Sequence, residues 1–293
     1  MDIGDYYSKS VESFRRNWKI TVPSIIASIL TIILFIVGLF GVMATLSPNL
    51  SIIGNVTPSI FSQINLNALL TAGLILLIIE IMIYIINAFR TAATVGMAKQ
   101  IIMDGSASLD IAWKDGIKFF PKIFAVSIIK TILTAIIAIP LILGFYLILN
   151  KVILGGISVL LIGSIILVIG YILISLLFFV FNQSIVVGQK SVIGSIKDSY
   201  NIFWNNKLTV FLVALINAVI SLGVGFILGI ILMPLAVVAG PLGPIANQLA
   251  GLLASIIIVP YFALVMTYMY MELKMGFQWI NGDVKDHIVS TGK

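Results

Sequence analysis

The sequence contains no cysteine and little charge, and these two deficits limit the kind of protein it can encode. Without Cys the chain has no disulfide, no thiol nucleophile and no Cys-based metal site. Its single His is too few for a His-based metal site. Only 10% of the residues are charged, against roughly 25% in a soluble domain, whereas 60% are hydrophobic and the mean hydropathy is +1.19. The composition predicts an integral membrane protein without metal or cofactor.

Six long apolar runs follow one another, separated by polar segments. They cover residues 20–46, 66–89, 121–149, 152–181, 208–233 and 249–271. Each is long enough, as a helix, to cross ~30 Å of hydrocarbon. We therefore expect a single all-α membrane domain over 1–293 with six transmembrane helices and a polar tail at 275–293.

A shorter amphipathic segment precedes every odd-numbered run. In 2–18, 109–120 and 188–207, apolar residues recur at helical spacing on one face, and basic residues lie on another. This pattern is typical of a helix that lies on an anionic membrane surface. The basic residues that we expect to contact lipid headgroups are Arg15, Arg16, Lys114, Lys118 and Lys197.

The distribution of positive charge predicts the orientation. Fifteen of the 17 Lys and Arg residues fall on one side of the six predicted spans, so the positive-inside rule places both termini and all three amphipathic segments in the cytoplasm. Units 2–89, 109–187 and 192–271 then share one order: amphipathic helix, span, outer turn, span. The alternative to a true repeat is that any span starting in the cytoplasm follows basic and aromatic residues.

Two stretches carry a resemblance to a known family. They are SVIGSIKDSYNIFWNNKLTVFLVAL and SLDIAWKDGIKFFPKIFAVSII. With these stretches the chain resembles a broad set of six-span proteins related to the membrane domain of glycerophosphoryl diester phosphodiesterases. In those enzymes the chemistry belongs to a separate soluble barrel, for which this chain has no counterpart. The resemblance therefore implies a membrane module without its catalytic partner, and it transfers no functional residue.

Two charged residues lie deep inside predicted spans. Glu80 is ten residues from Arg90, or ~15 Å along a helix, and Lys130 is eight residues from Lys122, or ~12 Å. They are therefore expected at similar depth on consecutive helices. One interpretation is structural: an ion pair, or a protonated Glu80 with Lys130 extended toward the interface. The other is functional: a proton or cation site in which Glu80 titrates and Lys130 supplies the counter-charge.

Other polar and small residues within the spans suggest helix contacts. Asn217 is expected at a comparable depth, where an amide either completes a polar pocket or bonds to a neighbouring helix. Small residues allow close approach within one chain or between chains, so a homo-oligomer or another membrane protein remains an alternative partner. The small positions are Gly156, Gly163 and Gly170 in the fourth span and Gly225 and Gly229 in the fifth.

The sequence indicates neither catalysis nor nucleic-acid binding. It has no HExxH, no phosphate-cradling Gly loop and no nucleophile beside a base. We predict a non-catalytic accessory, scaffold or lipid-organising module of the cytoplasmic membrane, with membrane lipids as partners. The alternative is a channel or a small-solute or ion transporter that uses Glu80, Lys130 and Asn217. A membrane-embedded lipid enzyme has the least support.

Overall fold

The computed structural model describes residues 2–50, 66–238, 243–276, 279–280 and 283–284, and nearly all of them are helical. Six helical segments of this described chain are long and apolar enough to cross a membrane: 18–45, 66–104, 109–149, 153–186, 207–234 and 248–274. This agrees with the six predicted spans. The predicted outer loop at 51–65 and most of the predicted polar tail lie outside the described residues.

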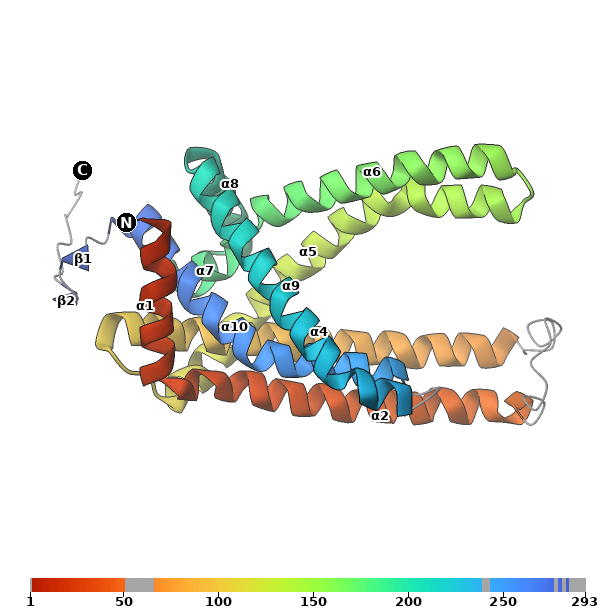
Figure 1. Cartoon of the computed structure of the whole chain (residues 1–293), viewed down its shortest axis with the longest axis horizontal. Coiled ribbons are helices and arrows are strands. Elements are labelled where there is room, and N and C mark those ends of the chain that lie inside the picture. Colours follow the sequence, from red (N-terminus) through yellow and green to blue (C-terminus); the bar gives the residue numbers. More distant parts are fainter. Residues whose placement is uncertain (1, 51–65, 239–242, 277–278, 281–282, 285–293) are drawn as a thin grey trace.

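The elements follow in one order along the chain (Figure 1). They are α1 (Ile3–Arg16), the 3-10 helix η1 (Trp18–Thr21), α2 (Val22–Leu50), α4 (Leu66–Asp104), α5 (Leu109–Leu149), α6 (Ile153–Leu177), α7 (Phe181–Val186), α8 (Val192–Asn205), α9 (Lys207–Val238), α10 (Gly243–Met275), and the strands β1 (Trp279–Ile280) and β2 (Asp283–Val284). The two strands pair antiparallel.

Three long helices differ from the predicted spans. α4 continues past the predicted end at residue 89 to Asp104, and its residues 92–98 are all buried, so protein packing sustains the helix beyond its lipid-like portion. α5 runs unbroken through Pro121, which therefore does not start a separate span helix. The fourth predicted span is interrupted after α6 by a turn at 178–180, and α7 is a separate short helix.

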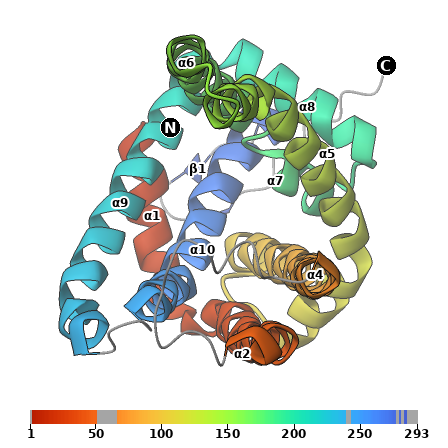
Figure 2. The same cartoon turned by 90° about the vertical axis from the view of Figure 1, so that its right-hand side faces the viewer.

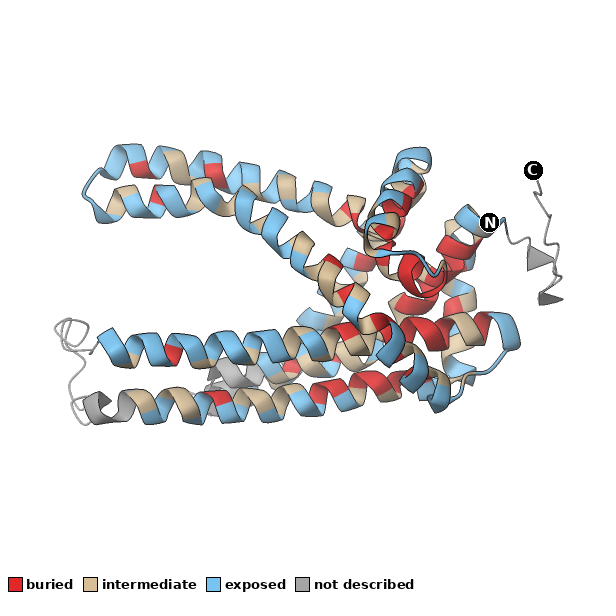
Figure 3. Ribbon diagram, turned by 180° about the vertical axis from the view of Figure 1, so that it is seen from behind, coloured by how far each residue is buried: buried red, intermediate tan, exposed pale blue. Residues whose placement is uncertain are grey.

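The buried core lies at the end of the molecule that contains α1, α7 and α8 (Figure 3). Toward the opposite end the helices expose many Leu, Ile and Phe side chains, as expected where lipid surrounds a helix. Large, fully buried side chains of the core are Tyr6 of α1, Met97 of α4, Ile123 of α5, Ile185 of α7 and Tyr270 of α10.

The long helices diverge from this packed end. α10 packs against α2, α4 and α9, and the end-on view places the α5–α6 pair apart from α2 (Figure 2). Figure 1 shows the α5–α6 pair running away from α4 toward the end opposite the packed end. α1 lies across the direction of α2 and α4 (Figure 1).

Glycines bring α5 and α6 together. Cβ atoms built on Gly144 and Gly163 would each lie 2.7 Å from a backbone nitrogen, that of Leu160 and of Leu141 respectively. Side chains cannot occupy that space, so the two helices touch backbone to backbone. The turn that joins them has Lys151 at a φ of 64°.

Candidate functional site

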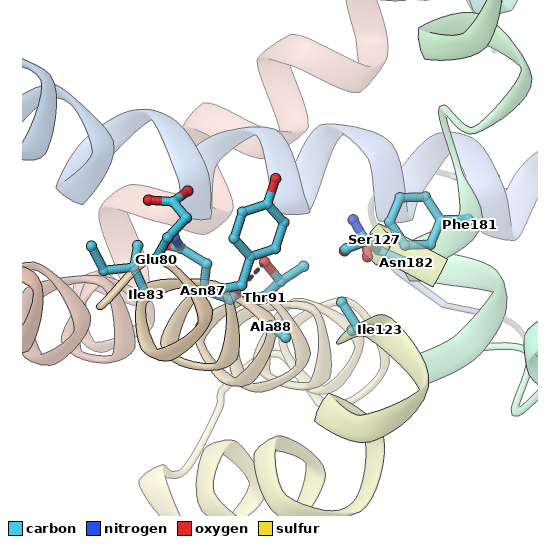
Figure 4. A pocket seen from close by; sticks show the side chains of 10 residues that line it. Glu80, Ile83, Asn87, Ala88, Thr91, Ile123, Ser127, Phe181 and Asn182 are labelled. Carbon is cyan, nitrogen blue, oxygen red and sulfur yellow. Dashed lines mark hydrogen bonds between the residues drawn. The ribbon is translucent and has the colours of Figure 1, made fainter. Parts of the chain in front are cut away.

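α4 carries a row of polar side chains. Glu80, Tyr84, Asn87 and Thr91 are spaced i, i+4, i+7 and i+11, which places them on one helical face. Figure 4 shows Glu80, Asn87 and Thr91 along α4, with the Glu80 carboxylate directed away from the helix axis. Thr91 Oγ1 donates to the Asn87 carbonyl at 2.8 Å, so this hydroxyl is satisfied within α4. All four members of the row line a cavity.

α5 supplies the facing wall. Ser127, Lys130, Thr131 and Thr134 are spaced i, i+3, i+4 and i+7, again on one face. Thr134 Oγ1 donates to the Lys130 carbonyl at 2.9 Å. The hydroxyls of Thr131 and Tyr84 lie 3.0 Å apart, so one hydrogen bond joins the two walls.

Two adjoining cavities lie between these walls. The first, of about 160 Å³, is lined by Glu80, and the second, of about 550 Å³, is lined by Lys130. Both are also lined by Tyr84, Ser127 and Phe181. The shared lining makes them neighbours. The second cavity falls within the size range of common ligand sites, ~300–1,000 Å³, and the first is smaller. In Figure 4, Ser127 and Phe181 lie across the first cavity from Glu80.

The structure forms no ion pair between Glu80 and Lys130, although both are within the described chain. The sequence suggested such a pair from their similar depth. Toward the end opposite the packed end, α5 diverges from α4 (Figure 1). The two charges instead line neighbouring cavities.

Asn217 does not reach this site. Its Oδ1 accepts a hydrogen bond of 2.9 Å from the Tyr7 hydroxyl, which also lies 3.1 Å from the Val213 carbonyl. Asn217 is buried, so its amide oxygen fastens α9 to α1. The predicted grouping of Asn217 with Glu80 and Lys130 is therefore absent from the structure.

The predicted packing glycines fall into two groups. Those of α6 face α5: a Cβ on Gly156 would lie 3.0 Å from the Gly144 carbonyl oxygen, and one on Gly170 would lie 2.8 Å from Ile137 Cδ1. A Cβ on Gly225 or Gly229 of α9 would meet nothing within 4 Å in the described chain. The close contacts found here are thus within one chain.

We call the three segments that the sequence predicted to be amphipathic the collar: α1 with η1, residues 109–120 of α5, and α8. Its members bury small or polar side chains. α8 buries Ser195 and Ser199, and α1 buries Ser10. The 109–120 segment buries Ala112 and Gly116. Each segment also buries large apolar side chains, namely Tyr6 and Ile20, Phe119, and Ile202, so the collar packs on the core. Other apolar side chains of the collar remain exposed.

One tryptophan is exposed on each collar segment. Trp18, Trp113 and Trp204 are 63%, 63% and 55% exposed. Tryptophan is enriched where hydrocarbon meets headgroups, because its ring is apolar and its N–H needs a polar partner. Each of the three collar segments therefore exposes one residue of a type that is common at membrane interfaces.

The five basic residues predicted to contact headgroups are all exposed. Arg16 pairs with Glu12 at 2.6 Å, at the surface of α1. Lys118 Nζ lies 4.8 Å from the centre of the Phe119 ring. Both contacts leave the charged groups of Arg16 and Lys118 at the surface.

A buried polar cluster at Asp198 was not predicted from the sequence. Asp198 is 5% exposed, and its carboxylate accepts from Ser184 Oγ at 2.7 Å, Tyr270 OH at 2.9 Å and Lys274 Nζ at 2.6 Å. Burial alone would raise the pKa of Asp198, but these donors lower it below the usual value. The cluster ties α8 to α7 and α10. Its sequence signal is the short polar row with Ser195 and Ser199 at helical spacing.

The comparison with family models gives one match over most of the chain. Residues 1–273 match the model for the domain of unknown function DUF7847. The chain belongs to that family. No curated protein and no solved structure matches it. The DUF7847 match shows no link to glycerophosphoryl diester phosphodiesterases.

Proposed function

We propose that this DUF7847 protein is a non-catalytic, lipid-organising module of the cytoplasmic membrane whose collar lies in the headgroup layer. The supporting observation is the exposed tryptophan on each of the three collar segments, at Trp18, Trp113 and Trp204. Each segment also carries exposed Lys or Arg side chains. A cation near an anionic leaflet contributes ~1 kcal/mol, so the collar would hold anionic lipids around the packed end.

In this proposal the six long helices form three hairpins, each introduced by one collar segment. The cytoplasmic side is the packed end, because the Lys and Arg residues gather there. The repeated units 2–89, 109–187 and 192–271 then each supply one hairpin. Partners are membrane lipids with anionic headgroups, and an accessory or scaffold role would add a second membrane protein.

Depth-dependent fluorescence quenching tests the collar. The full chain is reconstituted in vesicles with phospholipids brominated either near the headgroup or near the chain end. We expect shallow bromine to quench more strongly, and replacing Trp18, Trp113 and Trp204 by Phe to remove most of that quenching. Replacing Arg15, Arg16, Lys114, Lys118 and Lys197 by Gln should reduce enrichment of anionic lipid around the protein. Equal quenching at both depths would exclude a collar in the headgroup layer.

A channel or a small-solute or ion transporter is the second candidate. The adjoining cavities lined by Glu80 and Lys130 are the observation that favours it. Ion or solute flux into liposomes that is abolished in Glu80→Gln would support transport and contradict a purely organising role. Flux equal to that of protein-free liposomes would exclude the transporter.

A further inference from the structure

The cavities between α4 and α5 hold one acid and one base that lack an ion-pair partner in the described chain. Glu80 lies ~15 Å along α4 from Arg90, and Lys130 lies ~12 Å along α5 from Lys122. Charges at such depth in a bilayer are costly and normally have a partner or a ligand. A ligand that satisfies both side chains must itself carry both signs of charge.

The lining separates acceptors from donors. The Glu80 cavity also contains Asn182, whose Oδ1 is buried and has no hydrogen-bond partner among the described residues. The carboxylate and this amide oxygen both accept from N–H groups. The Lys130 cavity contains the ammonium of Lys130 and the hydroxyl of Thr131, which donate to anionic oxygens. The arrangement suits an ammonium in one cavity and a phosphate in the next.

The larger cavity has an apolar side. Ala135, Ala138 and Tyr171 line it together with Lys130, and Tyr171 is 51% exposed. The α5–α6 pair diverges from α4 at this level (Figure 1), so this side faces the region that lipid chains fill in a bilayer. A free polar solute would lie against hydrocarbon there. An amphiphile would place its polar headgroup in the cavities and its hydrocarbon chains between α4 and the α5–α6 pair.

We infer that the adjoining cavities bind the headgroup of a zwitterionic phospholipid, with its ammonium in the cavity of Glu80 and its phosphate at Lys130. The inference deepens the proposed lipid-organising function and rests on its premise that the long helices cross a bilayer. It does not depend on the position of the collar.

Native mass spectrometry of the full chain in detergent tests this inference with two phospholipids of identical chains. Phosphatidylethanolamine carries an ammonium, and phosphatidylglycerol does not. Glu80→Gln should weaken phosphatidylethanolamine binding roughly tenfold and leave phosphatidylglycerol binding unchanged, because only the ammonium loses its partner. Lys130→Gln should weaken both by a similar factor, because both lipids contain phosphate.

Matched variants control for charge and folding. Asp110→Asn and Lys190→Gln remove exposed charges outside the cavities and should change neither affinity. Glu80→Asp keeps the carboxylate and should keep the preference for phosphatidylethanolamine over phosphatidylglycerol. This variant still tests the inference if Glu80→Gln does not fold. Thermal unfolding of each variant reports the fold.

Three outcomes would overturn the inference: equal loss of both lipids in Glu80→Gln, no loss in Lys130→Gln, or displacement of lipid by free glycerophosphoethanolamine at the same concentration as the intact lipid. The last outcome would assign the cavities to a soluble zwitterion. A different result would refute only the collar function: the lipid affinities of the Glu80 and Lys130 variants change as expected, but lipid brominated near the headgroup does not quench tryptophan more strongly.

Discussion

Asp198 offers a sharp test of what holds the packed end together. Its buried carboxylate accepts from Ser184 of α7 and from Tyr270 and Lys274 of α10. Asp198→Asn keeps the shape of the side chain but removes the charge that all three donors share. We therefore expect the purified full chain in detergent to unfold at a lower temperature than the wild type.

The size of the effect follows from the contacts. A hydrogen bond to a charged group contributes ~1.5–3 kcal/mol. The Lys274 side chain is 40% exposed, so water replaces part of its contact, which we take as ~1 kcal/mol. The amide of Asn still accepts one hydrogen bond. The net loss is then ~3 kcal/mol, or roughly 6–12 °C in Tm for a chain of this size, whereas Lys274→Gln should lose only ~1 kcal/mol.

The same carboxylate gives a pH dependence with a definite sign. The donors lower the pKa of Asp198 in the folded chain even though burial alone would raise it. A depressed pKa stabilises the fold above the unfolded value of ~3.9, and this stabilisation is lost as pH falls through the folded pKa. The difference in Tm between wild type and Asp198→Asn should therefore be constant from neutral pH to about 5 and shrink below ~4.

Glu12→Gln provides the matched control. It breaks an exposed ion pair, in which the side chains of Arg16 and Glu12 are 75% and 61% exposed. Such exposed pairs contribute ~0.3–0.5 kcal/mol. For a chain of this size, a loss of that energy lowers Tm by about 2 °C or less. If Asp198→Asn had the same Tm as the Glu12→Gln control, the buried cluster at Asp198 would not stabilise the packed end.

Four further substitutions test packing elsewhere. Gly163→Ala should destabilise by ~1–3 kcal/mol, because its Cβ would lie 2.7 Å from the backbone of α5; Gly225→Ala, which meets nothing within 4 Å, should be neutral or stabilising in the same thermal assay. Arg90→Met should raise Tm, because Nε of Arg90 is buried without a partner among the described residues, and a lower Tm would contradict this. Tyr7→Phe should lower Tm by a few degrees through loss of ~1 kcal/mol at its hydrogen bond to Asn217, and an unchanged Tm would mean that the bond adds no stability.

The sequence predicted the long helices well because their signal is local. Six apolar runs specify six candidate spans without reference to any partner. It did not predict the extension of α4 to Asp104 or the break before α7, because burial against other segments decides both. The third apolar run was predicted to begin at residue 121, where proline would suit the first turn of a helix, yet the preceding turns of α5 continue through Pro121.

The candidate site was predicted only in part, for a similar reason. Depth along a helix can be counted from sequence, and it identified Glu80 and Lys130. The direction of a side chain around the bundle cannot be counted, so the ion pair between them was not realised and Asn217 lies at α1 instead. The row of Tyr84, Asn87 and Thr91 was visible as helical spacing from Glu80, but its facing wall on α5 needed the fold.

The core of the described chain lies at one end of the molecule. The α2–α4 pair and the α5–α6 pair therefore resemble two arms that share a pivot at that end (Figure 1). α6 has 25 residues and is therefore ~37 Å long, so a rotation of about 5° at the pivot shifts its far tip by ~3 Å. Lateral pressure in the surrounding bilayer acts with greatest leverage on those tips. A small change of packing at the packed end is therefore amplified into a larger shift at the far tip of α6.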